Sequence, residues 1–238
     1  LVGDIFIEWL AVDEYLDWLD VGCGNGAFSE LIVTSCSPNK VQGIDPSAEQ
    51  IDFAITRSAA ELTNFQVGDA MNLPLNDDSF DVAVMALVIF FVPDPPKGVA
   101  EMTRVVRPGG RVTSYTWDSI NKGSPSSLIS GQLINMGFTP ESPPNPQVSE
   151  MIALEELWSS NGLTDVESQI IEVERHFRDI EEYWNIASLF PNIQKIIPVL
   201  TEIQIIELKA RLETQLSIGS NGQLIQTATA NAIKGRVP

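Results

Sequence analysis

The sequence predicts an α/β fold with a doubly wound, mostly parallel sheet, and two observations carry this expectation. Short apolar runs alternate with segments of helical periodicity through the first half of the chain, as βα units around a parallel sheet require. A glycine-rich turn, Asp20-Val21-Gly22-Cys23-Gly24-Asn25-Gly26, follows the first apolar run, where such a fold passes from a strand into a helix. The 238 residues are 44% hydrophobic and 19% charged, which is enough for a substantial core. We therefore expect one domain over residues 1–238.

Five strands are expected in the first half, each an apolar run that ends at turn residues or at an acid. They cover residues 18–21, 40–44, 64–67, 80–87 and 111–117. Three helices are expected between them. Apolar residues repeat at helical spacing from Phe28 onward, Ser47 begins a capping-box pattern, and Asp94-Pro95 has the form of an N-cap followed by proline at the first helical position. Pro108-Gly109-Gly110 is expected to end the third helix.

The second half is less regular, and it completes a sheet that we expect to have seven strands, the last of them antiparallel. A capping box at Thr201 opens a helix whose apolar face carries Leu208 and Leu212. The other helices and strands are expected over residues 128–136, 153–159, 164–173 and 223–233.

Two segments interrupt the regular pattern, residues 119–147 and 177–216. The first is rich in Ser, Gly, Pro and Asn, and neither continues the βα alternation. We expect both to be lid insertions that fold over a ligand site and decide substrate specificity.

The net charge of the chain limits the kinds of molecule that we expect it to bind. It has 14 Lys and Arg against 32 Asp and Glu, a formal net charge of -18. A negative field of this size repels phosphate backbones and anionic lipid, so we expect a small-molecule substrate and no nucleic acid. No apolar run approaches the ~20 residues that cross a bilayer. The acidic start is unlike a signal peptide, so a soluble, cytoplasmic protein is expected, and a start at Leu1 indicates a trimmed chain. The oligomeric state is left open.

The cysteine and histidine content of the sequence does not favour a metal site or a disulfide framework. The two cysteines, Cys23 and Cys36, are too few for a disulfide framework or a metal cluster. Cys23 stands between loop glycines, where a small space-filling side chain is wanted. His176 is the one side chain that titrates near neutral pH and is a candidate base, although a surface histidine is the simpler interpretation. Asp118 follows the fifth strand, but no partner acids follow it at useful spacing, so no metal site is expected.

The glycine turn and three acids point to a nucleoside-bearing ligand. Without a Cβ in the way, the turn allows the backbone to approach a ligand closely. Asp20, Asp45 and Asp69 stand at the ends of consecutive parallel strands, which meet at one crevice. A carboxylate at Asp45 suits ribose hydroxyls, and one at Asp69 suits the adenine amino group. Three carboxylates disfavour a pyrophosphate and tolerate a sulfonium cation.

These residues resemble a known family. Leu19-Asp20-Val21-Gly22-Cys23-Gly24-Asn25-Gly26 is similar to motif I of class I S-adenosylmethionine-dependent methyltransferases. Supporting matches are Gly68-Asp69-Ala70 with Leu73-Pro74, Asp78-Ser79-Phe80-Asp81, and Glu101 followed by Arg104 to Gly110. The set resembles the type 11 branch, which includes the ubiquinone and menaquinone biosynthesis C-methyltransferases. The resemblance is specific from about Asp17 to Trp117 and weaker beyond.

The resemblance implies a Rossmann-like methyltransferase fold, S-adenosyl-L-methionine as cofactor and a small-molecule acceptor. The loop would hold the methionine portion, the acid after the second strand the ribose, and the acid after the third strand the adenine. Residues after the fourth strand would flank the sulfonium. The cofactor site that it implies comprises Asp20, Gly22, Cys23, Gly24, Asp45, Pro46, Asp69, Ala70, Met71, Ala86 and Leu87.

Two departures from the family pattern are visible. Phe90-Phe91 replaces a pair that often contains histidine, which removes a polar group from the substrate side. About seventeen residues precede the first strand where the family usually has more, so an N-terminal cofactor lid is expected to be shortened or missing. On the substrate side, the aromatic candidates are either pocket lining or core: Tyr115, Trp117, Tyr183 and Trp184.

Two other functions stay open. Gly22-x-Gly24-x-x-Ala27 with Asp45 also satisfies the pattern of a nicotinamide-dependent oxidoreductase. That alternative leaves Gly26 and the Asp69-Ala70 pair without a role. A protein that binds S-adenosylmethionine without transferring the methyl group is the other alternative, since methyl transfer needs no universal acid or base and the catalytic residue is unassigned.

Overall fold

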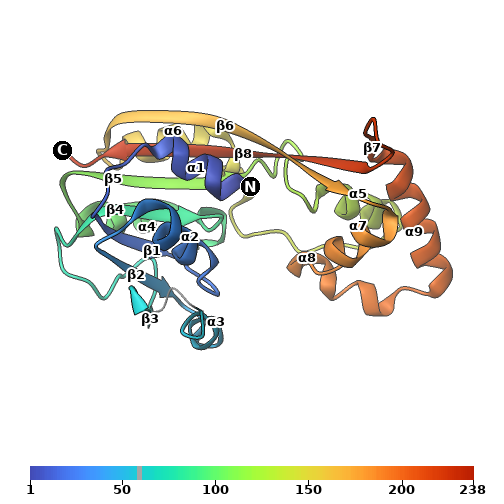
Figure 1. Ribbon diagram of the computed structural model, residues 1–238, viewed down its shortest axis with the longest axis horizontal. Helices are drawn as coiled ribbons and strands as arrows, with labels where there is room; N and C mark the ends of the chain where they lie inside the picture. The colour runs from blue at the N-terminus through green and yellow to red at the C-terminus, as the bar shows by residue number, and fades with distance from the viewer. Residues whose placement is uncertain (58–60) are drawn as a thin grey trace.

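The computed structural model describes residues 1–57 and 61–238 and places a twisted sheet with flanking helices beside a separate helical lobe (Figure 1). The strand order is β3-β2-β1-β4-β5-β8-β6, and a short β7 pairs with β8. The first five strands are parallel, whereas β8 lies between β5 and β6 and runs antiparallel to both. This confirms the predicted doubly wound sheet with an antiparallel last strand. The strands are β1 Asp17–Val21, β2 Lys40–Asp45, β3 Thr63–Val67, β4 Phe80–Ala86, β5 Val106–Trp117, β6 Thr164–Phe177, β7 Ser217–Ile218 and β8 Leu224–Arg236.

Helices cover both faces of the sheet, and each face has its own apolar core. Side chains of α1 and α2 pack with Trp18, Val84 and Tyr115 on one face. Side chains of α4 and α6 pack with Leu19 and Met85 on the other. Alternate residues of each strand therefore enter different cores, as the two-residue repeat of a strand requires. The helices of the body are α1 Val2–Leu10, α2 Ala27–Cys36, α3 Ala48–Ala54, α4 Pro95–Val105 and α6 Met151–Ser160.

The predicted helix starts are confirmed by their caps. The Ser47 hydroxyl accepts from the Gln50 backbone N–H at 3.3 Å, and Asp94 Oδ1 accepts from the Lys97 N–H at 3.2 Å. These caps satisfy donors that have no partner inside the helix. They also set the directions in which α3 and α4 leave the sheet.

The end of α4 was predicted wrongly. The helix stops at Val105 rather than at Pro108-Gly109-Gly110, and β5 begins at Val106, which pairs with Phe80 before a register shift. Gly109, with φ +84°, forms a turn whose N–H donates to the Val237 carbonyl at 2.8 Å. Pairing with both neighbouring strands therefore extends β5 through residues whose own preferences indicate a stop.

The helix α1 was not predicted. Phe6 and Leu10 are fully buried, and the Phe6 ring centroid lies 4.7 Å from that of Tyr115 and 6.1 Å from that of Phe28. Val2, Phe6 and Leu10 recur every four residues, so a helical pattern was present but short. The result is that α1 joins α2 over the sheet.

The helical lobe collects the two segments that were predicted as lid insertions. Ile129 and Leu133 from the first segment share a buried cluster with Tyr183, Leu208 and Leu212 from the second. The capping box at Thr201 is present. Strands β6 and β8 run between the body and this lobe (Figure 1), and β6 reaches Phe177, past its predicted end at residue 173. At the body end, β8 continues to Arg236 rather than ending at residue 233. The helices of the lobe are α5 Ser127–Asn135, α7 Ile180–Ala187, α8 Pro191–Gln194 and α9 Glu202–Gln215.

Among the elements that the described residues form are single turns of 3-10 helix at Ile89–Phe91, Pro146–Ser149 and Ile197–Val199. In the described ranges 1–57 and 61–238, no helix combines the length and the apolar character that crossing a membrane needs.

We predict that Phe6→Ala lowers the free energy of unfolding by about 3 kcal/mol or more, because it leaves a cavity beside two aromatic rings. The matched control is Ile5→Ala, one residue earlier on the exposed side of α1, with an expected loss of about 1 kcal/mol or less. Urea denaturation of both variants measures the difference. Equal losses would show that α1 does not depend on its buried face.

Candidate functional site

The glycine turn between β1 and α2 adopts a backbone that only glycine accepts readily. Gly22, Gly24 and Gly26 have φ of +75°, +51° and +77°. A Cβ at Gly22 would lie 2.5 Å from a Val88 methyl carbon, whereas one at Gly24 would meet nothing within 4 Å. The turn is thus packed tightly against Val88 at its start and open at Gly24.

Backbone bonds hold this turn on the end of β2. The N–H groups of Gly22 and Cys23 donate to the Ile44 carbonyl at 2.7 and 3.0 Å. Asp45, only 9% exposed, accepts from the Gly24 N–H through Oδ2 and from the Ser47 N–H through Oδ1, both at 2.9 Å. One carboxylate therefore joins the glycine turn to the start of α3, and it keeps lone pairs for a ligand hydroxyl.

Asp20 is a buried acid with one unpartnered oxygen. It is fully buried, and Oδ2 accepts from the Ser29 hydroxyl at 2.6 Å. Oδ1 has no hydrogen-bond partner within the described chain. Burial, and then the nearby charge of Asp45, raise the pKa of Asp20 to about 7, although the Ser29 bond opposes the rise. A ligand that donates to Oδ1 would satisfy this atom.

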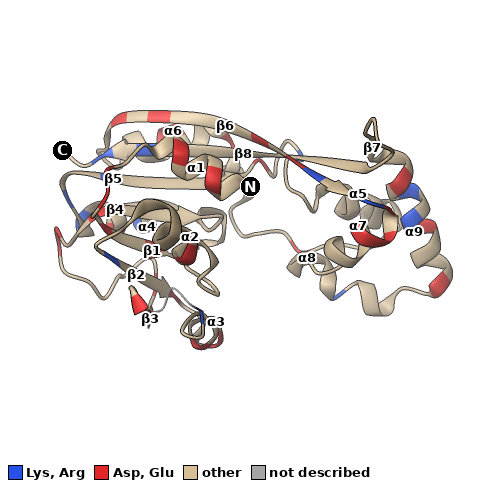
Figure 2. Ribbon diagram, viewed as in Figure 1, with Lys and Arg blue, Asp and Glu red and all other residues tan. Residues whose placement is uncertain are grey.

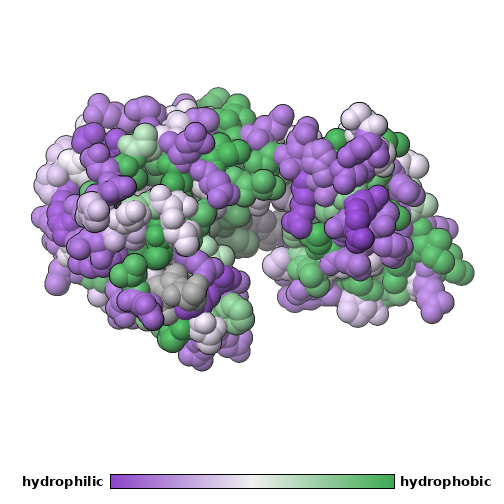
Figure 3. All heavy atoms as spheres, viewed as in Figure 1, coloured by the Kyte–Doolittle hydropathy of each residue, from purple (hydrophilic) through white to green (hydrophobic). Residues whose placement is uncertain are grey.

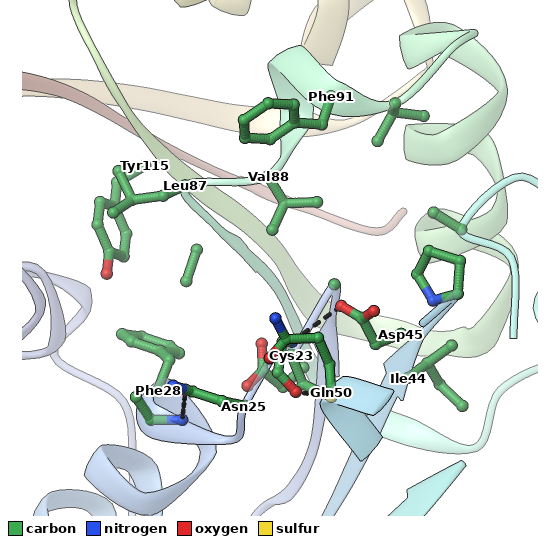
Figure 4. A pocket seen from close by; sticks show the side chains of 18 of the residues that line it. Cys23, Asn25, Phe28, Ile44, Asp45, Gln50, Leu87, Val88, Phe91 and Tyr115 are labelled. Carbon is green, nitrogen blue, oxygen red and sulfur yellow. Dashed lines mark hydrogen bonds between the residues drawn. The ribbon is translucent and has the colours of Figure 1, made fainter. Parts of the chain in front are cut away.

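These residues border a cavity of about 660 Å³, here called the glycine-loop cavity. Figure 4 shows Asn25, Asp45 and Gln50 on one side and Leu87, Val88 and Phe91 on the other. The cavity thus has a polar wall from the ends of β1 and β2 and an apolar wall from the segment after β4. Its volume lies within the range of small-molecule sites.

The structure brings most of the predicted cofactor residues to this one cavity. Its lining contains Asp20, Gly22, Cys23, Gly24, Asp45, Pro46, Asp69, Ala70, Ala86 and Leu87. Met71 is not part of this lining, so its role at the site stays a prediction. It packs against the apolar core, and its N–H donates to Asp69 Oδ1 at 2.8 Å in an Asx-type turn.

Several lining residues were missed. The N-terminal segment contributes Leu1, Gly3 and Asp4, α2 contributes Phe28, and the segment after β4 contributes Val88. The short apolar repeat of α1 was the available signal for the first group. Phe28 was recognised as a helix residue only, because periodicity identifies a buried face and does not say which cavity adjoins it.

The segment Glu101 to Arg107, part of the family resemblance, supports the site from a distance. Glu101 Oε2 accepts from the Leu73 N–H at 2.8 Å, and Arg104 donates to the Leu73 carbonyl at 3.1 Å and to Asp77 at 2.6 Å. Arg107 bridges Asp81 and Asp17 on neighbouring strands. Glu101 and Arg104 therefore hold the loop that follows Asp69, and Arg107 links β1 to β4. None of the three lines the cavity.

The candidate base and metal positions fall elsewhere. His176 is on β6 with its side chain 48% exposed, and its Nε2 lies 3.8 Å from Glu174 Oε2, outside the cavity lining. This agrees with the simpler interpretation of a surface histidine. Asp118 accepts from the Asn121 side-chain amide at 3.1 Å. Within residues 1–57 and 61–238, no group of three or more His, Cys, Asp or Glu residues is arranged to hold a metal.

The other chemically notable residues divide between cavity and core. Tyr115 lines the glycine-loop cavity, Trp117 and Tyr183 line a second one, and Trp184 lies beneath Lys209 in the lobe. Burial, reinforced by the charges of Asp20 and Asp45, raises the pKa of the Cys23 thiol. Cys23 is therefore an unreactive thiol that fills space under the turn.

Comparison with known proteins finds methyltransferases among the proteins that this chain resembles. Residues 19–113 match the family model described as a methyltransferase domain. The chain is 39% identical over 101 residues to demethylmenaquinone methyltransferase of Desulfitobacterium hafniense, covering 40% of either protein. It is 31% identical over 173 residues to the chloroplastic 2-phytyl-1,4-beta-naphthoquinone methyltransferase of Arabidopsis thaliana, covering 69% of this chain and 65% of that one. The chain thus spans less than two thirds of each relative's length.

A solved structure resembles the whole chain. The YcgJ protein of Bacillus subtilis superposes with a TM-score of 0.65, at 19% identity, over 99% of this chain and 97% of that one. At this identity the likeness concerns the fold, including the helical lobe as well as the sheet.

We predict that Gly22→Ala lowers the free energy of unfolding by more than the cost of placing alanine in a left-handed backbone conformation. The φ of Gly22 costs a non-glycine residue ~1–2 kcal/mol, and the overlap with Val88 adds ~1–3 kcal/mol. Gly162→Ala is the control, since Gly162 has φ +80° and open space around it. Urea denaturation should show the larger loss at Gly22, part of which Val88→Ala recovers. Equal losses would contradict the tight packing of the turn.

The raised pKa of Asp20 predicts a pH dependence of stability. Between its ordinary value of 3.8 and about 7, the folded protein keeps a proton that the unfolded chain has lost. The contribution of Asp20 to the free energy of unfolding therefore falls as the pH rises through this window, by up to about 1.4 kcal/mol per pH unit.

Asp20→Asn removes this contribution, so its stability relative to the parent should increase from pH 4.5 to pH 7.5. Urea unfolding of the unliganded proteins at several pH values measures the difference. Parallel curves for Asp20→Asn and the parent would refute the raised pKa.

Proposed function

We propose that this protein transfers a methyl group from S-adenosyl-L-methionine to a small-molecule acceptor. Residues 19–113 match the methyltransferase domain model, and the chain has the doubly wound fold of its solved structural neighbours. The observation that carries the proposal is the convergence of Asp20, the open turn at Gly24 and Asp45 on one cavity. Each offers what a different part of that cofactor needs.

The residues offer a partner to each part of the cofactor. Asp20 Oδ1 is an unpartnered acceptor for the methionine ammonium group, whose positive charge would favour the ionised carboxylate. Gly24 leaves room for close approach of the cofactor, and Asp45 keeps acceptor capacity for ribose hydroxyls. Asp69, exposed at the end of β3, would accept from the adenine amino group.

When bound, S-adenosylmethionine supplies a methyl group activated by attachment to a positively charged sulfur. The protein's part is to orient the reactants and to exclude water. Leu87, Val88 and Phe91 form an apolar wall that would shield this region, and the carboxylates behind the turn favour positive charge. Holding the acceptor in line with the methyl group can supply most of the rate without a dedicated base.

Tyr115 is the residue that we place nearest the transfer step. It is 4% exposed and lines the glycine-loop cavity, and burial, reinforced by the charge of Asp20, raises the pKa of its hydroxyl. The hydroxyl therefore stays protonated at neutral pH. We propose that it orients the acceptor through a hydrogen bond.

Charge and fold support a small acceptor. In Figure 2, Asp and Glu are spread over the body and the lobe, and Lys and Arg form no continuous patch in that view. We therefore propose a small molecule rather than a nucleic acid, and a lid role for the helical lobe. Cys23 and Cys36 are buried free thiols, which suit a reducing compartment. We therefore also propose that the protein acts in the cytoplasm.

Calorimetric titration with S-adenosylhomocysteine, with NAD as the comparison, tests the cofactor. We expect saturable binding of S-adenosylhomocysteine and none of NAD, because three carboxylates border the site. Asp45→Ala should weaken binding by ~1.5–3 kcal/mol, the value of a hydrogen bond to a charged group. Asp52→Ala, at an exposed acid of α3, should bind like the parent.

Each other outcome has a definite meaning. NAD binding would support the oxidoreductase alternative, and unchanged affinity in Asp45→Ala would refute this placement of the ribose. Label transfer from methyl-labelled S-adenosylmethionine to a panel of phenols and hydroquinones tests catalysis. Binding without transfer to any acceptor would favour the non-catalytic alternative.

A further inference from the structure

A second cavity, of about 370 Å³, lies where the long strands reach the helical lobe; we call it the arm cavity. In the space-filling view the surface is hollowed between the body and the lobe (Figure 3). Strands β6 and β8 provide Val173, Arg175 and Ala228, and α7 provides Tyr183 and Ile186. Most of the lining is apolar, which suits the body of an aliphatic or aromatic molecule.

The arm cavity adjoins the glycine-loop cavity. Tyr115 lines the glycine-loop cavity, and Trp117, two residues later on the same face of β5, lines the arm cavity. Leu1 borders both. A molecule seated in the arm cavity therefore has its near end beside the wall at which we place methyl transfer.

Arg175 is the one charged side chain in the lining of the arm cavity. The chain as a whole carries a net charge of -18. A cavity whose one charged side chain is positive therefore has the opposite sign to the protein as a whole. Arg175 has no ion pair within the described chain, and its guanidinium lies 5.6 Å from the centre of the Phe177 ring. The ring supports the cation while leaving its hydrogen-bond donors for a ligand.

A second polar group beside the same cavity lacks a well-formed hydrogen bond. Tyr183 is 1% exposed, and no described residue meets full hydrogen-bond geometry with its hydroxyl, although the Gln226 side chain lies close enough to interact with it. Burial raises the pKa of Tyr183, and this hydrogen-bonding contact with Gln226 opposes part of the rise. The Gln226 amide itself donates to the Pro125 carbonyl at 2.6 Å. A buried hydroxyl without a well-formed hydrogen bond costs free energy that a ligand oxygen would recover.

We propose that the arm cavity binds an organic carboxylate, and that the methyl acceptor is an amphipathic acid with an apolar body. The carboxylate would accept from Arg175 and from the Tyr183 hydroxyl, while the apolar body would contact Val173 and Ile186 and extend toward Tyr115. This inference rests on the proposed function for the identity of the acceptor. The anion site itself is defined by the lining of the arm cavity.

Two probe molecules of nearly the same shape test whether the arm cavity recognises a carboxylate. Naphthalene-2-carboxylate carries the anion, and naphthalene-2-carboxamide replaces it with a neutral group. We expect the parent protein to bind the carboxylate more tightly in calorimetric titrations, both with and without saturating S-adenosylhomocysteine. In the Arg175→Gln variant, the affinity for the carboxylate should fall about ten-fold. This is near the low end of the range for a hydrogen bond to a charged group, because Arg175 is exposed and solvent weakens the interaction.

The controls separate charge from folding. Arg178→Gln removes the same charge three residues away, from an exposed pair with Glu182 outside the cavity, and should bind like the parent. Tyr183→Phe should lower affinity for the carboxylate roughly two- to ten-fold, as expected for a neutral hydrogen bond. Affinity for the amide and for S-adenosylhomocysteine should not change in Arg175→Gln.

The outcomes distinguish this inference from the function on which it rests. Equal binding of the two probes, no binding of the carboxylate, or unchanged affinity in Arg175→Gln would overturn the anion site, whatever S-adenosylhomocysteine does. Carboxylate binding that depends on Arg175 in a protein that does not bind S-adenosylhomocysteine would keep the anion site and reject the methyltransferase function.

Discussion

The attachment of the glycine turn to the end of β2 is the constraint on which the candidate site depends. The Ile44 carbonyl accepts from two successive N–H groups of the turn, and the Asp45 carboxylate accepts from a third. These bonds require the left-handed backbone at Gly22, and Val88 closes the space beside it. Because β1, β2 and β4 are adjacent in the sheet, the turn, the acid and the apolar wall meet at one edge.

Electrostatics at this edge favour a cation. Asp20 is buried beside Asp45 in a protein that is already strongly acidic, and its raised pKa records the cost of that arrangement. A positively charged ligand would relieve the cost by pairing with the ionised carboxylate. The same carboxylates would repel a pyrophosphate, so one arrangement both attracts the proposed cofactor and discriminates against NAD.

The long pair β6 and β8 gives the fold its second functional surface. Beyond the body, their pairing continues through Arg175 opposite Gln226 and Phe177 opposite Leu224, at the base of the helical lobe. This extension connects the lobe to the body by strand pairing and places a lone positive side chain near the proposed transfer site. In the proposed function, acceptor choice and cofactor binding are separate, because different elements form the two proposed sites.

The amino-acid sequence by itself determined the order of the five parallel strands, the helices between them and the positions of the caps at Ser47 and Asp94. It did so because apolar period, turn residues and caps are local signals. The same signals located the glycine turn and the acids around it. They could not place the end of α4, because strand pairing overrides the local stop signal. The antiparallel direction of the last strand was implied by the family resemblance.

Only the tertiary structure decided which distant residues share a cavity. Helix α1 was too short to be recognised by its period, yet Phe6 packs on Tyr115 and places α1 beside the glycine turn. Arg175, Tyr183 and Trp117 come from three separate elements and meet only because β6 and β8 carry the lobe to the edge of the sheet. Such contacts depend on strand register and lobe packing, which are long-range interactions and leave no periodic trace in the sequence.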